Sequence, residues 1–297
     1  MPRKKIFKSG FVSLIGRPNV GKSTLMNALL GEKLAIVSNK PQTTRNKISG
    51  IFNAPSAQVI FIDTPGIHKP KGMLNEYMVK SARDACNEVD LILFMVEADK
   101  KPSAGEKDIL EFLKGLKTPV FLVINKVDLV AKDKLLPLIQ GYSTMHDFAE
   151  VVPISSLKGT NLEDLKKTVL DHLPEGPKYF PEDELTDQPE RFVAAEIIRE
   201  KIFHMTDEEI PYSTAVVVEE MKSKGNVIYT RADIYVEKDS QKGIIIGAKG
   251  RMLKKIGQAA RIDIERLLGS QVFLELWVKV KKDWREKPGT LKEMGYR

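Results

Sequence analysis

A glycine-bearing loop near the N-terminus carries the clearest chemical pattern in the chain. Its residues and the one that follows are Gly16, Arg17, Pro18, Asn19, Val20, Gly21, Lys22, Ser23 and Thr24. Two glycines let the backbone wrap so that amide N–H groups converge on phosphate oxygens, helped by the dipole of a following helix. Lys22 would supply a charge for the outer phosphates, and Ser23 a hydroxyl ligand for a bridging Mg²⁺ ion. The pattern predicts a phosphate-binding loop.

The flanking sequence gives this loop the context that it needs. A short apolar run, residues 11–15, precedes it, and a helical stretch, residues 22–30, follows it. A strand, a loop and a helix in that order are the setting in which such a loop binds phosphate. A chance match is the alternative, and the motifs further along the chain argue against it.

A second apolar run ends in a turn whose residue types suit bound phosphate. The run covers residues 57–62, and the turn is Asp63, Thr64, Pro65 and Gly66. An acidic residue at a strand end can hold a magnesium-coordinated water, and the Gly66 amide can approach a terminal phosphate. Alone, this sequence could be an ordinary turn, but its position after a strand predicts a phosphate sensor.

Another strand end carries residues suited to a purine base. Residues 120–124 are apolar and lead into Asn125, Lys126 and Asp128. The Asp128 carboxylate could accept parallel hydrogen bonds from the ring N–H and exocyclic amine of guanine, which adenine cannot donate together. Lys126 would lie along the base plane, and Asn125 would tie this loop to the phosphate loop. A later loop, Ser155 and Ser156, is expected to close around the base.

The spacing of these motifs resembles the translation-factor-related GTPases over residues 5 to about 175. Further apolar runs at 90–96 and 120–124, separated by a helical pattern at 106–116, predict parallel strands with crossover helices. The expected fold class is therefore α/β, a P-loop GTPase domain with a mostly parallel sheet. Residues 41–45 resemble the first switch of the Era family. The resemblance assigns the magnesium-ligating threonine to Thr44, with Thr43 as the second choice.

The residues around the third phosphate also predict how fast the reaction runs. Ile67 follows Gly66 where many GTPases have a glutamine that orients water, so unaided hydrolysis should be slow. Beside it, His68 is expected to be an exposed switch residue rather than a base. In related GTPases an asparagine at the position of Asn19 helps to bind K⁺, and a role in loop geometry alone is the equal alternative. Lys22, Thr44 and Gly66 are the expected catalytic residues, and Ser23, Thr44 and Asp63 the expected metal site.

The second half of the chain predicts a smaller α+β domain. A helical pattern at 191–205 precedes two β-rich runs, 212–218 and 227–236, then a glycine-bearing loop that leads into a helix ending at Leu268, and a last strand at 271–280. This order resembles a type II KH domain, whose Gly-x-x-Gly loop matches residues 247–250. The expected RNA-binding residues are Ile246, Gly247, Ala248, Lys249, Gly250, Arg251, Lys254 and Lys255.

Charge and composition give the expected domain limits. Residues 175–190 hold six acidic residues, one lysine and three prolines, which favours a linker at 176–190. We expect the GTPase domain at 5–175, the KH domain at 191–282 and a tail at 283–297. From residue 241 onward, 14 Lys and Arg face 6 Asp and Glu, which favours contact with nucleic acid.

The whole arrangement is similar to the Era family of GTPases. The resemblance implies a GTP-hydrolysing switch that binds the 3′ end of small-subunit ribosomal RNA and assists assembly of that subunit, with Mg²⁺ and GTP or GDP as ligands. Ser156 departs from the alanine usual in the family. The alternative is a nucleotide-stabilised RNA-binding platform, in which hydrolysis is not coupled to RNA binding.

The remaining sequence features bear on the compartment. A single cysteine, Cys86, excludes an internal disulfide and fits a reducing compartment. Neither a signal peptide nor a membrane-spanning run is evident, so a cytoplasmic monomer is expected. The family resemblance leaves peripheral association with the inner face of the membrane as an open alternative.

Overall fold

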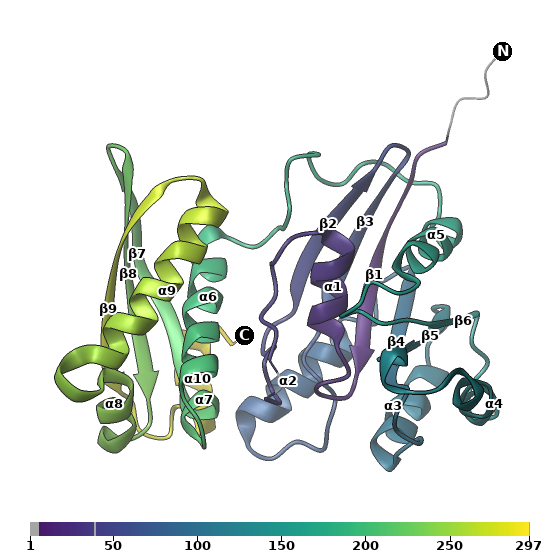
Figure 1. Ribbon diagram of the computed structural model, residues 1–297, viewed down its shortest axis with the longest axis horizontal. Coiled ribbons are helices and arrows are strands. Elements are labelled where there is room, and N and C mark those ends of the chain that lie inside the picture. The colour runs from purple at the N-terminus through teal and green to yellow at the C-terminus, as the bar shows by residue number, and fades with distance from the viewer. Residues whose placement is uncertain (1–5, 39, 297) are drawn as a thin grey trace. The chain divides into compact units, whose positions relative to one another are not determined.

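Two compact units make up the described part of the chain, which is residues 6–38 and 40–296 of the computed structural model (Figure 1). The first unit combines the residues up to Ala35 with Thr44–Pro70 and Met78–Asp187. The second combines the described residues of Ile36–Thr43, Lys71–Tyr77 and Gln188–Arg297. The expected start of the first domain, residue 5, and the end of the tail, residue 297, lie outside the described residues.

A six-stranded sheet forms the first unit, in the order β2-β3-β1-β4-β5-β6. Its strands are β1 (Lys8–Gly16), β2 (Ile48–Ala54), β3 (Ala57–Asp63), β4 (Leu91–Glu97), β5 (Val120–Asn125) and β6 (Glu150–Pro153). Only β2 and β3 pair antiparallel, across the short turn after Ala54. Every other pair is parallel, so most strands end at the same edge of the sheet.

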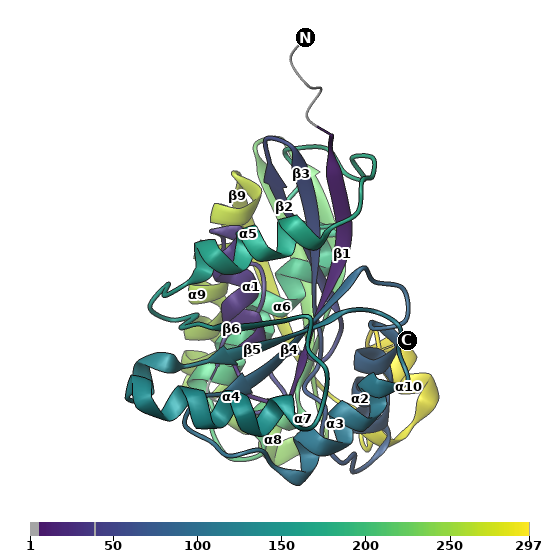
Figure 2. The same cartoon turned by 90° about the vertical axis from the view of Figure 1, so that its right-hand side faces the viewer.

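Helices cover both faces of this sheet (Figure 2). They are α1 (Lys22–Leu30), α2 (Met73–Asp84), α3 (Ala104–Lys114), α4 (Leu135–Ser143) and α5 (Leu162–His172). Because both faces are covered, all residues of β4 and β5 are buried, which accounts for their apolar sequences up to Val96 and Ile124. One core joins α2, α3 and α4 to this pair of strands, and α1 packs on β2 and β3 over the opposite face. The mostly parallel sheet predicted from the sequence is confirmed.

The second unit is a three-stranded sheet with helices on one face. Its strands are β7 (Ala215–Lys224), β8 (Val227–Val236) and β9 (Gln271–Val280). The first pair is antiparallel and the second parallel, which places β9 at an edge. The helices are α6 (Glu190–Met205), α7 (Ile210–Ser213), α8 (Asp239–Ile246) and α9 (Arg251–Leu268). A core of buried aliphatic residues joins α6 and α9 to the sheet, so the expected smaller α+β domain is confirmed.

The acidic stretch that the sequence marks as a linker packs along the first unit up to residue 187. The Gln58 amide oxygen accepts the N–H groups of Tyr179 and Phe180 at 2.8 and 3.0 Å. Further along, the Ile51 N–H donates to the Leu185 carbonyl at 2.9 Å. This stretch therefore runs as an ordered strap beside β2 and β3 over most of its length.

The residues after 282 also fold against their own unit. They form the short helix α10 (Pro288–Glu293) and a preceding turn in which Trp284 is fully buried. The Trp284 indole donates to the Ser213 carbonyl at 2.9 Å and stacks on Tyr296 at 5.8 Å between ring centroids. No helix in the described residues combines the length and apolar character needed to span a membrane.

Candidate nucleotide site and RNA groove

The phosphate loop connects β1 directly to α1. Gly21 caps the helix with φ 100°, and an added Cβ would lie 2.2 Å from the Asn125 side-chain nitrogen, so only glycine fits there. Lys22 is 6% exposed, and its Nζ donates to the carbonyls of Gly16 and Arg17 at 3.4 and 3.1 Å. Burial lowers the pKa of this amine to about 8, and the nearby Asp63 carboxylate opposes the shift. The loop thus encloses an ammonium group that an anion would stabilise.

Three oxygen-bearing side chains meet beside this lysine. Asp63 Oδ2 accepts hydrogen bonds from Ser23 at 2.6 Å and from Thr44 at 3.0 Å, and the two hydroxyls are 2.9 Å apart. Burial raises the pKa of Asp63, and Lys22 and the two hydroxyls oppose that rise. Asp63 Oδ1 is buried without a hydrogen-bond partner in the described residues. An orphaned carboxylate oxygen beside two hydroxyls fits a hard cation such as Mg²⁺ or its bound water.

The two candidate threonines of the switch differ in their surroundings. Thr44 belongs to the first unit and lies in the oxygen cluster. Thr43 belongs to the second unit, and its hydroxyl donates to the Lys40 carbonyl at 2.8 Å. Geometry therefore favours Thr44 over Thr43 as the metal ligand.

The turn after β3 lies against the phosphate loop. An added Cβ on Gly66 would lie 2.5 Å from the Pro18 nitrogen. The Ile67 N–H donates to the Gly16 carbonyl at 3.0 Å, and its side chain is buried. His68, which the sequence predicted to be exposed, is partly buried with Nδ1 2.9 Å from the Gly66 carbonyl oxygen. This contact fixes the ring beside the turn.

The residues expected to hold a base gather at the ends of β5 and β6. The Asn125 amide donates to the Val20 carbonyl at 2.8 Å, which ties this region to the phosphate loop. On its other side, the Asn125 oxygen accepts the N–H and hydroxyl of Ser156 at 2.9 and 3.0 Å. Asp128 is exposed, and its Oδ1 accepts the buried Ser155 hydroxyl at 2.5 Å. One carboxylate oxygen is held in place, and the group stays open to a ligand.

The sequence analysis missed one residue of this region, Glu97. It is the last residue of β4 and is buried, and its carboxylate pairs with the ammonium groups of Lys126 and Lys100. Burial alone would raise the pKa of Glu97, but the two lysines hold it below its usual value. Glu97 therefore fixes the direction of Lys126. An acidic residue directly after an apolar run was the available signal.

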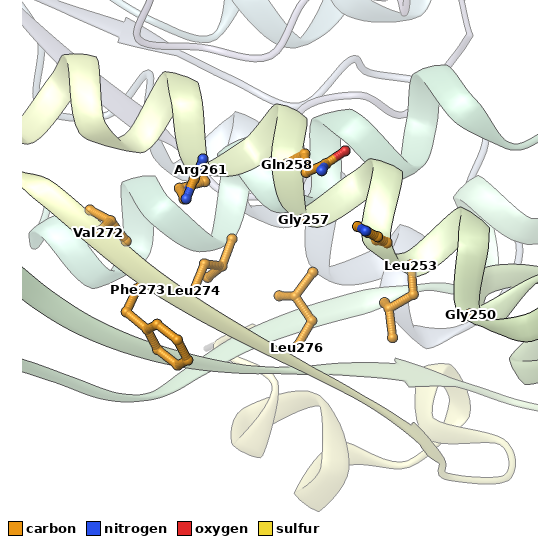
Figure 3. Close-up of a pocket in the computed structure, with 10 residues that line it drawn as sticks. Gly250, Leu253, Gly257, Gln258, Arg261, Val272, Phe273, Leu274 and Leu276 are labelled. Carbon is orange, nitrogen blue, oxygen red and sulfur yellow. The ribbon is translucent and has the colours of Figure 1, made fainter.

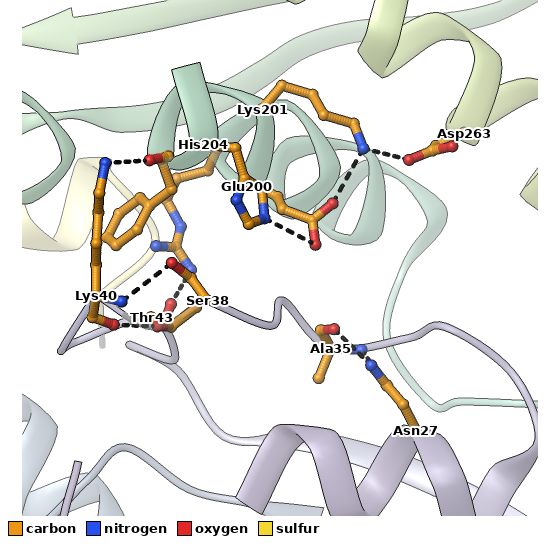
Figure 4. A network of polar contacts seen from close by, with 11 residues as sticks. Asn27, Ala35, Ser38, Lys40, Thr43, Glu200, Lys201, His204 and Asp263 are labelled. Atoms are coloured by element: carbon orange, nitrogen blue, oxygen red, sulfur yellow. Dashed lines mark hydrogen bonds and ion pairs between the residues drawn. The ribbon is translucent and has the colours of Figure 1, made fainter. Parts of the chain in front are cut away.

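Two short segments, one before and one after Thr44–Pro70 in the sequence, belong to the second unit. In segment 36–43, Lys40 Nζ donates to the Phe203 carbonyl at 2.8 Å (Figure 4). It also donates to the Thr206 carbonyl, just after α6. The fully buried Arg199 guanidinium of α6 pairs with Glu196 and donates to the Thr43 carbonyl. Sequence patterns gave no sign of this contact.

Segment 71–77 makes matching contacts with the C-terminal residues. The Glu286 carboxylate accepts the Met73 N–H at 3.3 Å, at the N-terminus of α2. Tyr77 meets Tyr296 edge to face at 5.8 Å between ring centroids. The two segments that flank Thr44–Pro70 are therefore held by contacts with α6 and with the C-terminal residues.

The glycine-bearing loop of the second unit lies between α8 and α9. Gly247 and Gly250 have φ of 69° and 76°, and Lys249 is also left-handed at 52°. An added Cβ on Gly247 would lie 2.7 Å from that of Met252. These angles bring the backbone into a tight turn whose basic side chains, Lys249 and Arg251, are exposed.

A groove of about 460 Å³ runs from this loop along α9 and the edge strand β9 (Figure 3). It is lined by Gly250, Leu253, Lys254, Gly257, Gln258, Arg261, Val272, Phe273, Leu274 and Leu276. The apolar floor comes from β9 and α9. Ile246, which the sequence predicted to bind RNA, packs against the core instead. Of the predicted RNA-binding residues, only Gly250 and Lys254 line this groove. Ile246 is the last residue of α8, and the others lie on the loop or on the first turns of α9.

Comparisons with known proteins match both units. A family described as a 50S ribosome-binding GTPase matches residues 11–126, and the KH domain family matches residues 209–285. The GTPase Era of Geobacter metallireducens is 59% identical over 292 residues, 98% of either chain.

Two solved structures have nearly the same fold. One is Era in complex with MgGDPNP and nucleotides 1506–1542 of 16S ribosomal RNA, and the other is an Aquifex aeolicus Era variant bound to GDP and AlF4⁻. Each has a TM-score of 0.94 at 46% identity, over 98% of this chain and 99% of the other. The chain belongs to the Era family, and it is a GTPase with a KH domain.

Proposed function

We propose that this chain is a GTP-driven switch that binds the 3′ end of 16S ribosomal RNA through its KH groove and assists assembly of the small subunit. The observation that carries the proposal is the membership of segments 36–43 and 71–77 in the second unit. These segments precede and follow Thr44–Pro70, the stretch that contains Thr44 and Gly66, where the bound nucleotide would change when its last phosphate leaves. The Era complex with 16S nucleotides, 46% identical to this chain, supports the choice of RNA.

The nucleotide roles follow from the site geometry. Lys22 and the loop amides hold the phosphates, and Ser23, Thr44 and Asp63 hold a Mg²⁺ ion, which neutralises charge on the phosphate oxygens. Support for the ion comes from the orphaned Asp63 oxygen and from the Era structure that contains MgGDPNP. Asp128 reads the guanine edge, and Lys126, directed by Glu97, lies along the base.

Hydrolysis without a helper should be slow. The residue after Gly66 is a buried isoleucine, which cannot orient the attacking water. The backbone of Asn19 is in the left-handed conformation, with φ 65°. That geometry fits a K⁺ ligand and equally fits a purely structural loop residue. Equal hydrolysis rates in sodium and potassium buffers would remove K⁺ from the proposal.

The coupling between nucleotide and RNA runs through α6. Thr44 would be held by a metal ion bound with the third phosphate, and the carbonyl of the preceding residue, Thr43, accepts a hydrogen bond from Arg199. A ligand can shift an equilibrium only through such a differential contact. Residues of α6 share one hydrophobic core with α9, which lines the groove. A change in the contact between Arg199 and Thr43 would therefore reach the groove through α6.

Replacing Arg199 by methionine should uncouple the two ligands. In the unmodified chain we expect RNA affinity to differ by about 5- to 150-fold between a non-hydrolysable GTP analogue and GDP, the usual range of allosteric coupling. In Arg199→Met the ratio should fall toward one while GDP affinity stays the same. Fluorescence anisotropy of a labelled 16S 3′-end oligonucleotide measures the RNA affinity in each nucleotide state, and calorimetric titration measures the GDP affinity.

A matched variant separates coupling from simple damage to α6. Arg191→Met makes the same change at an exposed position of the same helix, and its ratio should stay near that of the unmodified chain. Equal RNA affinities for the two nucleotides in the unmodified chain would support the static-platform alternative instead.

The compartment and assembly state follow the sequence expectations. The chain acts as a cytoplasmic monomer in this proposal, with one thiol, Cys86, which is buried. Binding to the inner face of the membrane would have to rest on basic residues, which are a weak anchor by themselves. Vesicle sedimentation tests that alternative directly.

A further inference from the structure

An aromatic surface lies on the face of the second sheet that carries no helices. Phe273 and Trp277 of β9 are 60% and 54% exposed. Alternation along the strand puts them, with Glu275 between them, on the side opposite to the groove-lining leucines. Figure 3 shows Leu274 and Leu276 directed toward α9 and Phe273 directed away from it. Tyr229 of β8 lies opposite Phe273, with ring centroids 5.9 Å apart and planes 14° apart.

The polar groups on this face hold the rings in place. The Glu275 carboxylate accepts the Tyr229 hydroxyl at 2.6 Å and the Trp277 indole N–H at 2.8 Å. These two hydrogen bonds lower the pKa of Glu275. Because the indole N–H of Trp277 already has a partner, the exposed part of that ring is chiefly its apolar face. A sheet that presents ordered aromatic faces is the platform on which RNA-binding domains stack bases.

Charge on this face does not by itself attract a polyanion. Lys279 is paired with Asp233, and Lys222 with Glu220. Lys224 lies over the Tyr229 ring at 4.5 Å. Affinity here would therefore come from stacking, which depends little on salt, whereas the basic loop and α9 supply the phosphate contacts.

We propose that the surface formed by Phe273 and Trp277, with Tyr229 packed beside Phe273, stacks the bases of single-stranded RNA that leaves the groove around the edge of β9. Continuity favours RNA over a protein partner, because Phe273 belongs both to the groove lining and to this surface. The inference rests on the proposed RNA-binding function of the groove and extends it to a second, sequence-tolerant surface.

Oligonucleotide length separates the two surfaces. Four nucleotides fill a KH groove, and eight would reach the sheet face. With the full chain and a fixed GTP analogue, Trp277→Ala should leave the affinity for a four-nucleotide 16S oligomer unchanged. It should weaken binding of the eight-nucleotide oligomer by about 5- to 100-fold per lost stack, with an unchanged salt slope. Trp277→Phe should restore most of that loss.

Fluorescence gives a second readout. The chain has two tryptophans, and Trp284 is fully buried, so acrylamide quenching reports on Trp277. The eight-nucleotide oligomer should protect Trp277 from acrylamide, and the four-nucleotide one should not. Tyr179→Ala, which removes a half-exposed aromatic ring from the first unit, is the control and should change neither readout.

The outcomes separate this inference from the proposed function. If neither oligomer bound, the proposed RNA-binding function of the groove would be wrong. Binding of both lengths with no effect of Trp277→Ala would overturn only the aromatic surface as an RNA site. If Trp277→Ala instead lost binding to a protein of the purified small subunit, the surface would be a site of protein contact.

Discussion

Replacing Asp128 by asparagine should turn the nucleotide preference of this chain from guanine to xanthine. The carboxylate accepts two N–H groups of guanine, and an asparagine offers one donor and one acceptor, which suits the carbonyl that xanthine has in place of the amine. We expect GDP affinity to fall by about 10²- to 10⁴-fold and XDP affinity to rise, since a polar site rejects a ligand that leaves its groups unpaired. Calorimetric titration with both diphosphates measures the change.

The structure offers a control for this substitution nearby. Asp133 is exposed in the next short helix and lacks the hydroxyl contact that Asp128 makes with Ser155. Asp133→Asn should leave the ratio of GDP to XDP affinity as it is. If Asp128→Asn left the ratio unchanged as well, the base would have to be read by another group.

Lys22→Ala should abolish tight nucleotide binding. Removing one partner of a buried charge pair costs about 2–5 kcal/mol, which corresponds to a loss of about 30- to 5000-fold in affinity. Because the free protein encloses this ammonium at a cost, seen in its lowered pKa, the variant should fold without nucleotide. The measurement is the rise in melting temperature with saturating GDP, which mass action predicts to disappear. Lys107→Ala, an exposed lysine on α3, should keep the full rise.

The nucleotide motifs could be predicted because each is contiguous in sequence. Residues 16–23 and 125–128 are short runs at strand ends, and the parallel sheet brings those ends to one edge. Glu97 could not be assigned in the same way, because its role depends on Lys126 arriving from the neighbouring strand. The edge strand β2 was not predicted either, because Gly50 and Asn53 weaken its β-strand pattern. Its strand conformation depends on antiparallel pairing with β3.

Long-range contacts limited the prediction of the second unit more strongly. The strand Gln271–Val280 was predicted with its observed ends, yet its place beside α9, which creates the groove, depends on parallel pairing with β8. Arg199 had no local signal, because its partner Thr43 lies 156 positions away. Composition marked residues 176–190 as a linker, but the buried Gln58 amide fixes part of this stretch to the first unit. Polarity alone did not reveal that fixed partner.

The most direct measurement of the central claim is calorimetric titration of the unmodified, folded chain with GDP and with ADP in the presence of Mg²⁺. The account predicts tight binding of GDP and affinity for ADP that is weaker by several orders of magnitude, because only guanine offers Asp128 two donors. Equal affinities for the two diphosphates would contradict it.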